Sequence, residues 1–484
     1  MAFAVRGVLE GFYGRPWAWS ERERMLEFMG QWGFNLYVYA PKNDPIHRNR
    51  WREPYLPEEV SRFGKLVRMA KERGIDFVFG LSPLQYHYSS PADFDVVWAK
   101  LMPLYEQGCR AFSILLDDMP DRFHHADDGE RFASVAEAQV WFNNLVLDRL
   151  RALGDESVKL YFCPTEYHGA GDSPYLRALG EGLDQAIEVF WTGREVCSQV
   201  LTTADARVVS ATLRRPVLYW DNYPVNDLDM RQDLHIRPVK GREKDLDTAC
   251  RGIVANGGRQ PEANKIPFHT YAQYMADPEG YEPELAWQKA LLAVTGNPED
   301  AVAVAVLGDL ARRSALERGH HLDNFLMPLI HCYWELLGGR PPSQAGPDLP
   351  DLAVQSTPYL PTGQPVDRER AIAHIRTAYG RVRNAADRLL SGQMSNTYLE
   401  HELKQWSVKL KGWSQVADLA IDVLDRALKN PHDPELPAMR EAVLDRILTT
   451  RENFVWVGGD MTDQFARRCL WAADALKGGT VADA

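Results

Sequence analysis

The chain has 484 residues, 25% of them charged, and a formal net charge of −12. This length is enough for two or three domains with large cores, and the acidic balance argues against nucleic acid or an anionic membrane as the main partner. The six cysteines lie far apart and form no CxxC pair, which argues against zinc ribbons and thioredoxin-like redox sites and fits a reducing compartment.

Short apolar segments alternate with helical patterns from the N-terminus onward. We expect eight strands, at residues 5–10, 35–40, 75–80, 111–116, 158–163, 186–191, 217–220 and 252–255. Ser20 and Glu23 have the spacing of a capping box, which predicts that the helix after the first strand begins there. Regular strand–helix alternation implies a parallel sheet, so the pattern predicts an α/β fold, a closed (β/α)8 TIM barrel. A doubly wound open sheet is the alternative. We prefer the barrel because polar residues follow nearly every strand, and in a barrel those loops meet at one mouth.

The strand pattern stops near residue 284, and helical periods follow. The expected helices span residues 284–316, 320–337, 368–390, 396–429, 434–450 and 462–476. Residues 340–365 are rich in Pro, Gly and Ser, which indicates a long loop. We therefore predict a barrel domain over residues 1–280 and an all-α helical bundle over residues 281–484.

The strand at 111–116 ends in two adjacent carboxylates, Asp117 and Asp118. A buried carboxylate costs several kcal/mol, or becomes neutral, unless other groups compensate it. An N-cap or a structural salt bridge would also explain a single acid at a strand end. Because two acids occur together, we take this pair as the candidate chemical centre.

Hydrogen-bonding residues follow many of the other strands. The full set is Gly11, Lys42, Asp117, Asp118, Tyr167, Thr192, Asn222, Asp227 and Asn264, with Trp220 as a second aromatic residue beside Tyr167. Few of them are cations, so the set suits a neutral polar ligand such as a sugar better than a phosphate. Asp227 with Asn226 also fits an Asx-turn, and Cys163 lies among apolar residues, which favours a packed thiol over a nucleophile.

Other familiar chemistries lack their motifs. The chain has no G-x-S-x-G elbow, Walker A loop or H-E-x-x-H helix. Residues 124–128 include His and Asp side chains of the kind that bind metals, but their spacing favours a solvated loop.

Seven segments, taken together, carry a resemblance to a known family. They are residues 7–17 (GVLEGFYGRPW), 39–44 (YAPKND), 115–118 (LLDD), 163–167 (CPTEY), 191–193 (WTG), 220–222 (WDN) and 262–264 (EAN). In this order they resemble glycoside hydrolase family 84, the O-GlcNAcase and bacterial hyaluronidase-like family. The resemblance covers residues 5–275, and Asn43 departs from it where members often carry an acid. It implies a barrel followed by a helical stalk, and a hydrolase that needs no cofactor and no metal.

The resemblance also implies a mechanism and roles for single residues. It implies a retaining exo-β-N-acetylglucosaminidase in which the 2-acetamido group of the substrate is the nucleophile and an oxazoline is the intermediate. Asp117 would orient the acetamido N–H, and Asp118 would be the general acid and then the general base. The remaining residues would bind the sugar: Tyr167 and Asn222 the acetamido group, Asp227, Gly11, Lys42 and Asn264 the hydroxyls, and Trp220, Cys163 and Thr192 the wall of the acetyl pocket. We expect Asp118 to be the more desolvated acid and to start the reaction protonated.

The expected substrate carries N-acetylglucosamine, and Ser- or Thr-linked sugar on proteins or peptides is the preferred case. Glycan or cell-wall fragments are the alternative substrates for a β-N-acetylhexosaminidase. Two other readings stay open: a metal-dependent barrel hydrolase that uses Asp117, Asp118 and Asp221 as ligands, and a non-catalytic sugar-binding scaffold. The N-terminal sequence has no signal-peptide pattern and no apolar run is long enough to span a bilayer, so we expect a cytoplasmic protein. The resemblance implies a bacterial one, and a homodimer through the helical domain stays open.

Overall fold

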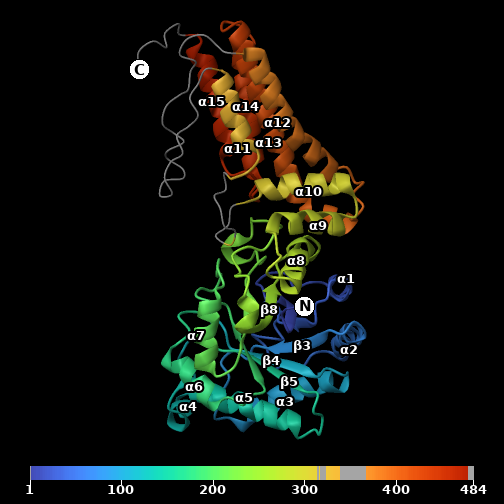
Figure 1. Cartoon of the computed structure of the whole chain (residues 1–484), viewed down its shortest axis with the longest axis vertical. Coiled ribbons are helices and arrows are strands. Elements are labelled where there is room, and N and C mark those ends of the chain that lie inside the picture. The colour runs from blue at the N-terminus through green and yellow to red at the C-terminus, as the bar shows by residue number, and fades with distance from the viewer. Residues whose placement is uncertain (1, 313–315, 317–322, 338–366, 478–484) are drawn as a thin grey trace. The chain divides into compact units, whose positions relative to one another are not determined.

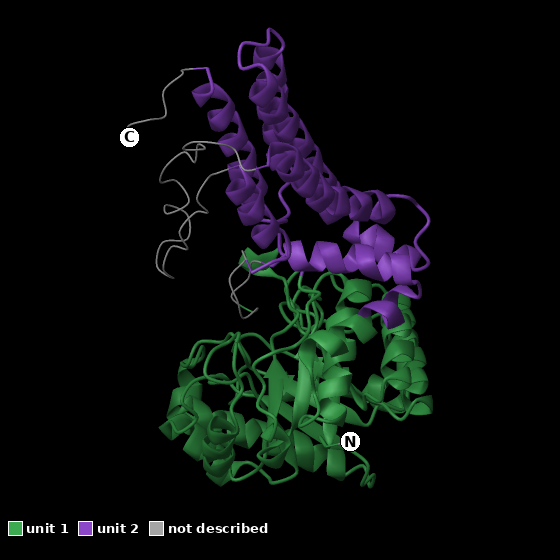
Figure 2. Ribbon diagram, turned by 45° about the horizontal axis from the view of Figure 1, so that its top comes forward, with its two compact units in different colours: residues 1–231, 235–290, 315–318 green, residues 232–234, 291–314, 319–484 purple. Residues whose placement is uncertain are grey.

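The structure is a computed structural model that describes residues 2–312, 316, 323–337 and 367–477. It divides into two compact units: residues 1–231, 235–290 and 315–318 form the first, and residues 232–234, 291–314 and 319–484 form the second (Figure 2). The domain limits drawn from the sequence, at residues 280 and 281, stay a prediction. The predicted loop at 340–365 lies outside the described residues.

The first unit contains a closed barrel of parallel strands (Figure 1). The strands are β1 Val5–Glu10, β2 Leu36–Tyr39, β3 Asp76–Leu81, β4 Ala111–Leu115, β5 Lys159–Cys163, β6 Ile187–Trp191, β7 Val217–Asp221 and β8 Cys250–Asn256. They pair in chain order, and β8 pairs with β1 with Gly7 opposite Val254, which closes the sheet. The predicted (β/α)8 barrel is therefore confirmed.

Every second side chain of the barrel strands points into the barrel interior. Its apolar cluster consists of Leu9, Leu36, Val38, Ala40, Val78, Ala111, Leu115, Tyr161, Cys163, Phe190, Leu218, Trp220 and Val254. Side chains alternate between the two faces of a strand, so the next residue in the same phase beyond the end of each strand projects into the barrel mouth. This phase decides which side chains reach the site described below.

α-Helices connect the strands and cover the barrel, except between β7 and β8, where the chain forms two short 3-10 helices, Leu228–Met230 and Leu246–Thr248. The α-helices are α1 Trp19–Gln31, α2 Pro57–Glu72, α3 Pro91–Glu106, α4 Ala126–Arg131, α5 Val135–Arg151, α6 Pro174–Gly182, α7 Thr203–Leu213 and α8 Pro261–Ala276. The capping box predicted at Ser20 and Glu23 is wrong. Helix α1 begins one residue before Ser20, and the Glu21 carboxylate accepts a hydrogen bond from the Ala18 N–H at 2.5 Å. Glu23 instead pairs with Lys65 at 2.6 Å.

In the described residues after the barrel, the secondary structure is helical, as predicted. The helices are α9 Pro283–Thr295, α10 Pro298–Leu310, α11 Leu326–Leu336, α12 Arg368–Leu389, α13 Thr397–Lys429, α14 Leu436–Glu452 and α15 Met461–Ala475. The single helix predicted over 284–316 is two helices, because Asn297 caps α10 by accepting from the Glu299 N–H at 2.8 Å. In the second unit, α13 packs against α12, α14 and α15 and buries Trp406 and Trp413.

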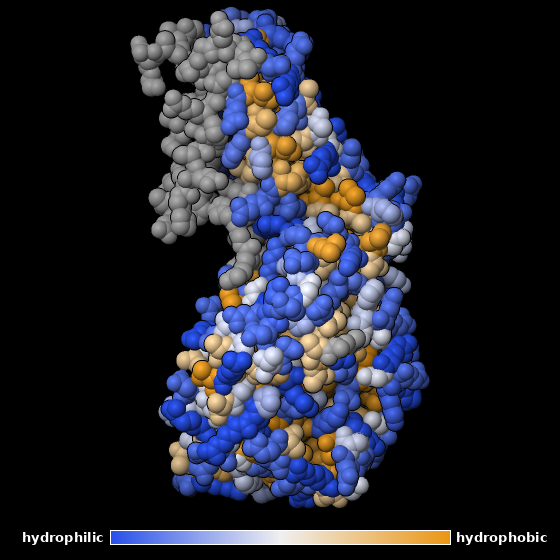
Figure 3. All heavy atoms as spheres, viewed as in Figure 1, coloured by the Kyte–Doolittle hydropathy of each residue, from blue (hydrophilic) through white to orange (hydrophobic). Residues whose placement is uncertain are grey.

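The described helices also bear on membrane association. None of those in the described ranges combines the length and apolar character that crossing a bilayer requires. On the face of the molecule shown in Figure 3, hydrophobic side chains occur in small groups among hydrophilic ones.

Candidate active site

A pocket of about 570 Å³ lies where the barrel loops meet, and residues of the first unit line it. Of the predicted site residues, Gly11, Lys42, Asp117, Asp118, Cys163, Tyr167, Thr192, Trp220, Asn222 and Asp227 contribute to its wall. The wall also contains Tyr13, Val196, Cys197, Val225, Leu228, Asp229, Met230 and Asn256, which the sequence did not single out. The structure thus brings together residues from loops spread over more than 240 positions of the chain.

Strand phase explains how two adjacent acids reach one pocket. Asp117 continues the inward phase of Ala111 and Leu115, so it projects into the mouth without distortion. Asp118 is out of phase and would point away from the pocket if the strand continued. Its backbone has a positive φ of 57°, a left-handed conformation that aspartate tolerates better than most residues, and this change turns its carboxylate back into the same pocket.

Asp117 is a half-satisfied buried acid. Only 6% of its side chain is exposed, and its Oδ2 forms an ion pair with the Lys42 ammonium. Among the described residues, its buried Oδ1 has no hydrogen-bond partner. Lys42 also lies 3.9 Å from Asp118. Burial alone would lower the pKa of Lys42, but the two neighbouring carboxylates outweigh it and raise that pKa, which favours the ammonium form.

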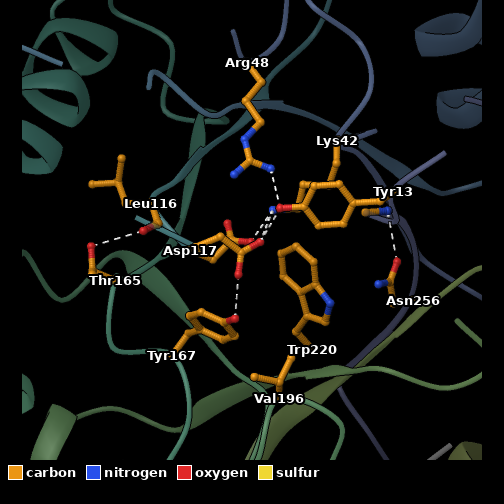
Figure 4. A network of polar contacts seen from close by, with 12 residues as sticks. Tyr13, Lys42, Arg48, Leu116, Asp117, Thr165, Tyr167, Val196, Trp220 and Asn256 are labelled. Carbon is orange, nitrogen blue, oxygen red and sulfur yellow. Dashed lines mark hydrogen bonds and ion pairs between the residues drawn. The ribbon is translucent and has the colours of Figure 1, made fainter. Parts of the chain in front are cut away.

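Asp118 is the more exposed acid, with 33% of its side chain accessible. Tyr13 donates its hydroxyl to Asp118 Oδ2 at 2.7 Å and Tyr167 donates to Oδ1 at 2.8 Å (Figure 4 shows both phenols around the acid pair). Partial burial would raise the pKa of Asp118, but the Lys42 charge and the two phenols outweigh it and lower this pKa. The prediction that Asp118 is the more desolvated acid and starts protonated is therefore wrong for the free protein. Its neighbours come from loops far apart in the sequence, and the strand pattern does not reveal them.

An amide network forms one side of the pocket. The Asn222 side-chain oxygen accepts from Trp220 Nε1 at 2.9 Å and from Asn256 Nδ2 at 2.8 Å. Its nitrogen donates to the Val196 carbonyl at 2.7 Å. These bonds fix the indole of Trp220 and the amide of Asn222 in the pocket wall. The Cys163 thiol is fully buried and burial raises its pKa well above the ordinary value, which agrees with a packed thiol.

The loop after β1 is held by side chains from the end of β8 and from the loops after β7 and β2. Its Gly11 N–H donates to Asn256 at 3.0 Å, the Tyr13 N–H donates to Asp227 at 2.7 Å, and the Gly14 N–H donates to Asn43 at 3.0 Å. Asn43 thus has a structural contact, which an aspartate could also make. Burial raises the pKa of Asp227. Position 11 needs glycine because a Cβ there would lie 2.7 Å from the Trp220 ring.

One predicted site residue does not reach the pocket. Asn264 lies inside α8 and not in the loop before it, and only 3% of the residue is exposed. Its side-chain oxygen accepts from the Gly258 N–H, so it shapes the loop after β8. Asn256 at the end of β8 reaches the pocket instead. Asn256 continues the inward phase of Val254, and this is the sequence signal that indicates its position.

The two metal readings find little support in the geometry. Asp221 does not line the pocket; both of its oxygens accept from Arg242, with Nε to Oδ2 at 2.7 Å. Elsewhere in the described residues, ligand atoms of His87, Asp127 and Asp128 lie within 4.8 Å of one another. Asp128 is completely buried there and accepts backbone N–H groups of residues 88 and 89. The prediction of a solvated loop over 124–128 is therefore wrong in part, because residues 126–128 begin helix α4 and the buried Asp128 holds the neighbouring loop.

Several known proteins are similar to this chain in sequence or in structure. The family model described as β-N-acetylglucosaminidase matches residues 6–308. Protein O-GlcNAcase of Rattus norvegicus and of Mus musculus is each 38% identical over 275 residues, which cover 55% of this chain and 29% of theirs. The match thus spans less than a third of the length of these relatives. A mutant O-GlcNAc hydrolase of Thermobaculum terrenum is similar in structure, with a TM-score of 0.84, 31% identity and coverage of 99% of this chain and 96% of that one. A protein named CpGH84B has a TM-score of 0.77 at 26% identity, with coverage of 97% and 77%.

Proposed function

Because the chain belongs to the β-N-acetylglucosaminidase family, we propose that it is a retaining exo-β-N-acetylglucosaminidase whose substrate supplies the nucleophile. The observation that supports this most is the buried Oδ1 of Asp117, which has no partner in the described part of the chain. An unsatisfied buried acceptor costs about 1–3 kcal/mol. Substrate binding would offset that cost if the ligand donates a hydrogen bond to Oδ1, and the N–H of a 2-acetamido group is such a donor.

In the first step, the acetamido carbonyl oxygen attacks the anomeric carbon while the bond from that carbon to the leaving oxygen breaks. Asp118 gives its proton to the leaving oxygen. Asp117 holds the acetamido N–H and stabilises the positive charge that develops on the oxazoline ring. Intramolecular attack of a well-oriented group is worth roughly 7–11 kcal/mol, which removes the need for a protein nucleophile.

In the second step, the ionised Asp118 takes a proton from water as the oxygen of that water attacks the anomeric carbon. The oxazoline ring opens, its oxygen returns to the acetamido group, and the product keeps the β configuration. The lowered pKa of Asp118 in the free protein suits this base role. For the acid role, the proton must be acquired when a bound sugar covers the carboxylate and raises its pKa.

The other pocket residues divide between the two ends of the sugar in this proposal. Tyr167 and Asn222 bind the acetamido group, and Trp220, Cys163 and Thr192 enclose its methyl. Asp227, Lys42 and the Gly11 backbone take the ring hydroxyls. Asn264 has no direct role, because it does not line the pocket.

The substrates that we favour are proteins or peptides with N-acetylglucosamine on Ser or Thr. The similar proteins named Protein O-GlcNAcase and O-GlcNAc hydrolase support this choice. Glycan or cell-wall fragments are the alternative. The free cysteines fit a reducing cytoplasm. The proposal also includes a homodimer formed through the helical domain.

A chromogenic aryl β-N-acetylglucosaminide tests the activity directly. We expect hydrolysis that a chelator does not reduce and that a thiazoline mimic of the oxazoline inhibits competitively. Product that first appears as the β anomer, followed by NMR, identifies retention. An inverted product, or loss of activity with chelator, would contradict the mechanism. Absence of any turnover by the folded protein would favour the scaffold reading.

A further inference from the structure

Arg48 is a buried cation at the edge of the pocket that the mechanism above does not use. It lies in the loop between β2 and α2, and 7% of it is exposed. In the described part of the chain, its side-chain hydrogen bond is from Nη1 to the Tyr13 hydroxyl at 2.8 Å. Its guanidinium carbon also lies 5.4 Å from the centre of the Tyr13 ring. Figure 4 shows this side chain reaching the phenol from the side opposite Tyr167.

The loop that carries Arg48 is anchored on both sides. The fully buried His47 ring bonds through Nδ1 to the Gly80 carbonyl at 2.8 Å, and the His47 carbonyl accepts from the Ser82 N–H at 3.1 Å. The Arg48 N–H donates to the Pro45 carbonyl at 3.3 Å. Tyr13 is fixed as well, since its backbone N–H is held by Asp227. The contact between Arg48 and Tyr13 therefore joins two ordered segments.

Hydrogen-bond direction follows from chemistry. A guanidinium carries donors and no acceptor, so the Tyr13 oxygen must accept from Arg48. A phenol has one proton, and the remaining partner of Tyr13 is Asp118 Oδ2 at 2.7 Å. The proton of Tyr13 is thereby directed onto Oδ2. Tyr167, the partner of Oδ1, has no such constraint and can accept as well as donate.

We propose that Arg48 is a positioning residue for Asp118: it directs the Tyr13 proton onto Oδ2 and leaves Oδ1, beside Tyr167, as the oxygen that carries the catalytic proton. This inference rests on the proposed role of Asp118 as acid and base. A proton on Oδ2 would face the proton of Tyr13, whereas a proton on Oδ1 meets a phenol that can turn. Arg48 thus selects one of two chemically equal oxygens.

The test compares Arg48→Met with Arg48→Lys, which keeps a cation and donors, and with Arg50→Met as a control on an exposed arginine of the same loop. Each variant is assayed on an alkyl N-acetylglucosaminide, a poor leaving group, and on a dinitrophenyl one. We expect Arg48→Met to lower kcat about tenfold on the alkyl substrate, a fraction of a general acid's usual 10²–10⁴. The dinitrophenyl substrate should change little, Arg48→Lys should recover part of the loss, and Arg50→Met should match the wild type.

A pH profile separates positioning from general damage. The groups that face Asp118 are Lys42, Asp117, Tyr13, Tyr167, Asp227 and, through Tyr13, Arg48. Removing the Arg48 cation raises the pKa of Asp118, so the alkaline limb on the alkyl substrate should move to higher pH. Tyr13→Phe should reduce the same rate. The double variant should be no slower than the slower of the two single variants, because both substitutions disrupt the same hydrogen-bonded pair of Arg48 and Tyr13.

Three outcomes would overturn the inference: equal losses on both substrates, additive losses with Tyr13→Phe, or an alkaline limb that does not move. If Arg48→Met does not fold, the cycle of Arg48→Lys with Tyr13→Phe gives the same comparison. Asp118→Asn is measured beside them. If Asp118→Asn slows the alkyl and dinitrophenyl substrates equally, both the proposed function and this inference are contradicted. If Asp118→Asn slows the alkyl substrate more and Arg48→Met does not, only the role of Arg48 fails.

Discussion

The ends of β4 and β7 each carry a buried acid with a basic partner, yet the two acids differ in use. At the end of β7, Asp221 is out of phase with the inward residues Leu218 and Trp220, and both its oxygens are taken by Arg242. At the end of β4, Asp117 is in phase with Leu115, and Lys42 takes one oxygen while the other stays unfilled. The fully paired acid has no free oxygen for a ligand, whereas the half-paired one in the barrel mouth is the acid that we propose binds the substrate.

The end of β1 carries a second acid that is fully paired within the protein, as Asp221 is. Glu10 follows the inward residue Leu9, is completely buried, and accepts two hydrogen bonds from Arg22 at 2.8 Å and one from Tyr37 at 2.7 Å. An arginine fork can fill both oxygens of a carboxylate, but a lysine is a point charge that fills one. The partner's chemistry, together with strand phase, therefore separates the structural acids from the candidate catalytic one.

The largest effect on activity is expected at the half-satisfied acid. Asp117→Asn should lower kcat/KM on the order of 10²–10³-fold, as loss of a transition-state hydrogen bond typically does. The loss should be similar for alkyl and dinitrophenyl N-acetylglucosaminides, because both need the acetamido nucleophile. Steady-state kinetics on the two substrates measures it. Lys42 then keeps only the more distant carboxylate of Asp118, at 3.9 Å, so the free energy of unfolding should also fall, and the kinetic constants are compared per folded protein. Full activity would remove Asp117 from the mechanism.

The neighbouring acid should give a selective effect. Asp118→Asn should slow the alkyl substrate by roughly 10²-fold, within the usual range for a general acid, and should barely slow attack on the dinitrophenyl one, whose leaving group needs no proton. A series of aryl leaving groups would show a steeper dependence of rate on leaving-group pKa in the variant. Equal losses across the series would argue against the acid role.

The satisfied acid should affect folding more than chemistry. Asp221→Asn leaves the Arg242 side chain, 4% exposed, without its carboxylate, and removing one partner of a buried pair costs about 3–5 kcal/mol. Urea denaturation should show this fall in the free energy of unfolding, while kcat of the folded fraction stays near wild type. Asp76→Asn is the matched control, because its pair with Lys159 is about half exposed and should cost less than about 1 kcal/mol. Equal costs for both would contradict the comparison.

The smallest expected effect is a difference in pH between the alkaline limbs of the kcat and kcat/KM profiles. In the free protein the pKa of Asp118 is lowered, so its protonated form becomes scarce as pH rises, and kcat/KM falls. A bound sugar covers the exposed third of this side chain, and loss of water raises its pKa. The alkaline limb of kcat should therefore lie at higher pH than that of kcat/KM on the alkyl substrate. Coincident limbs would show that binding does not change the acid's environment.

Much of the fold was predictable because the strand signal is strong. Each barrel strand is short and mostly apolar, all except β7 lead into an α-helix, and the predicted strands overlap all eight observed ones. The predicted helix limits differ from the observed ones at two positions where a local start signal is present in the sequence. Pro261 marks the start of α8, and Asn297 with Pro298 marks the start of α10; a proline in the first helical turn favours such a start.

The site was predictable in part. Residues that continue the inward phase, such as Lys42, Thr192 and Asn222, could be placed from the sequence alone, and the same rule selects Asn256 over Asn264. The ionisation of Asp118 could not be predicted, because it depends on a positive φ and on donors from loops after β1, β2 and β5. The Gly-Phe-Tyr-Gly segment did contain Tyr13, but nothing in one sequence indicates that its hydroxyl meets Asp118.

The loop after β1 has three backbone N–H groups tied to Asn256, Asp227 and Asn43. A sugar that enters this pocket meets a receptor whose shape is already set, so little ordering entropy remains to be lost on that side of the complex. Encounter should then be governed by diffusion and orientation instead of a slow rearrangement of this loop. Selectivity among sugars would accordingly arise from fit to a rigid surface.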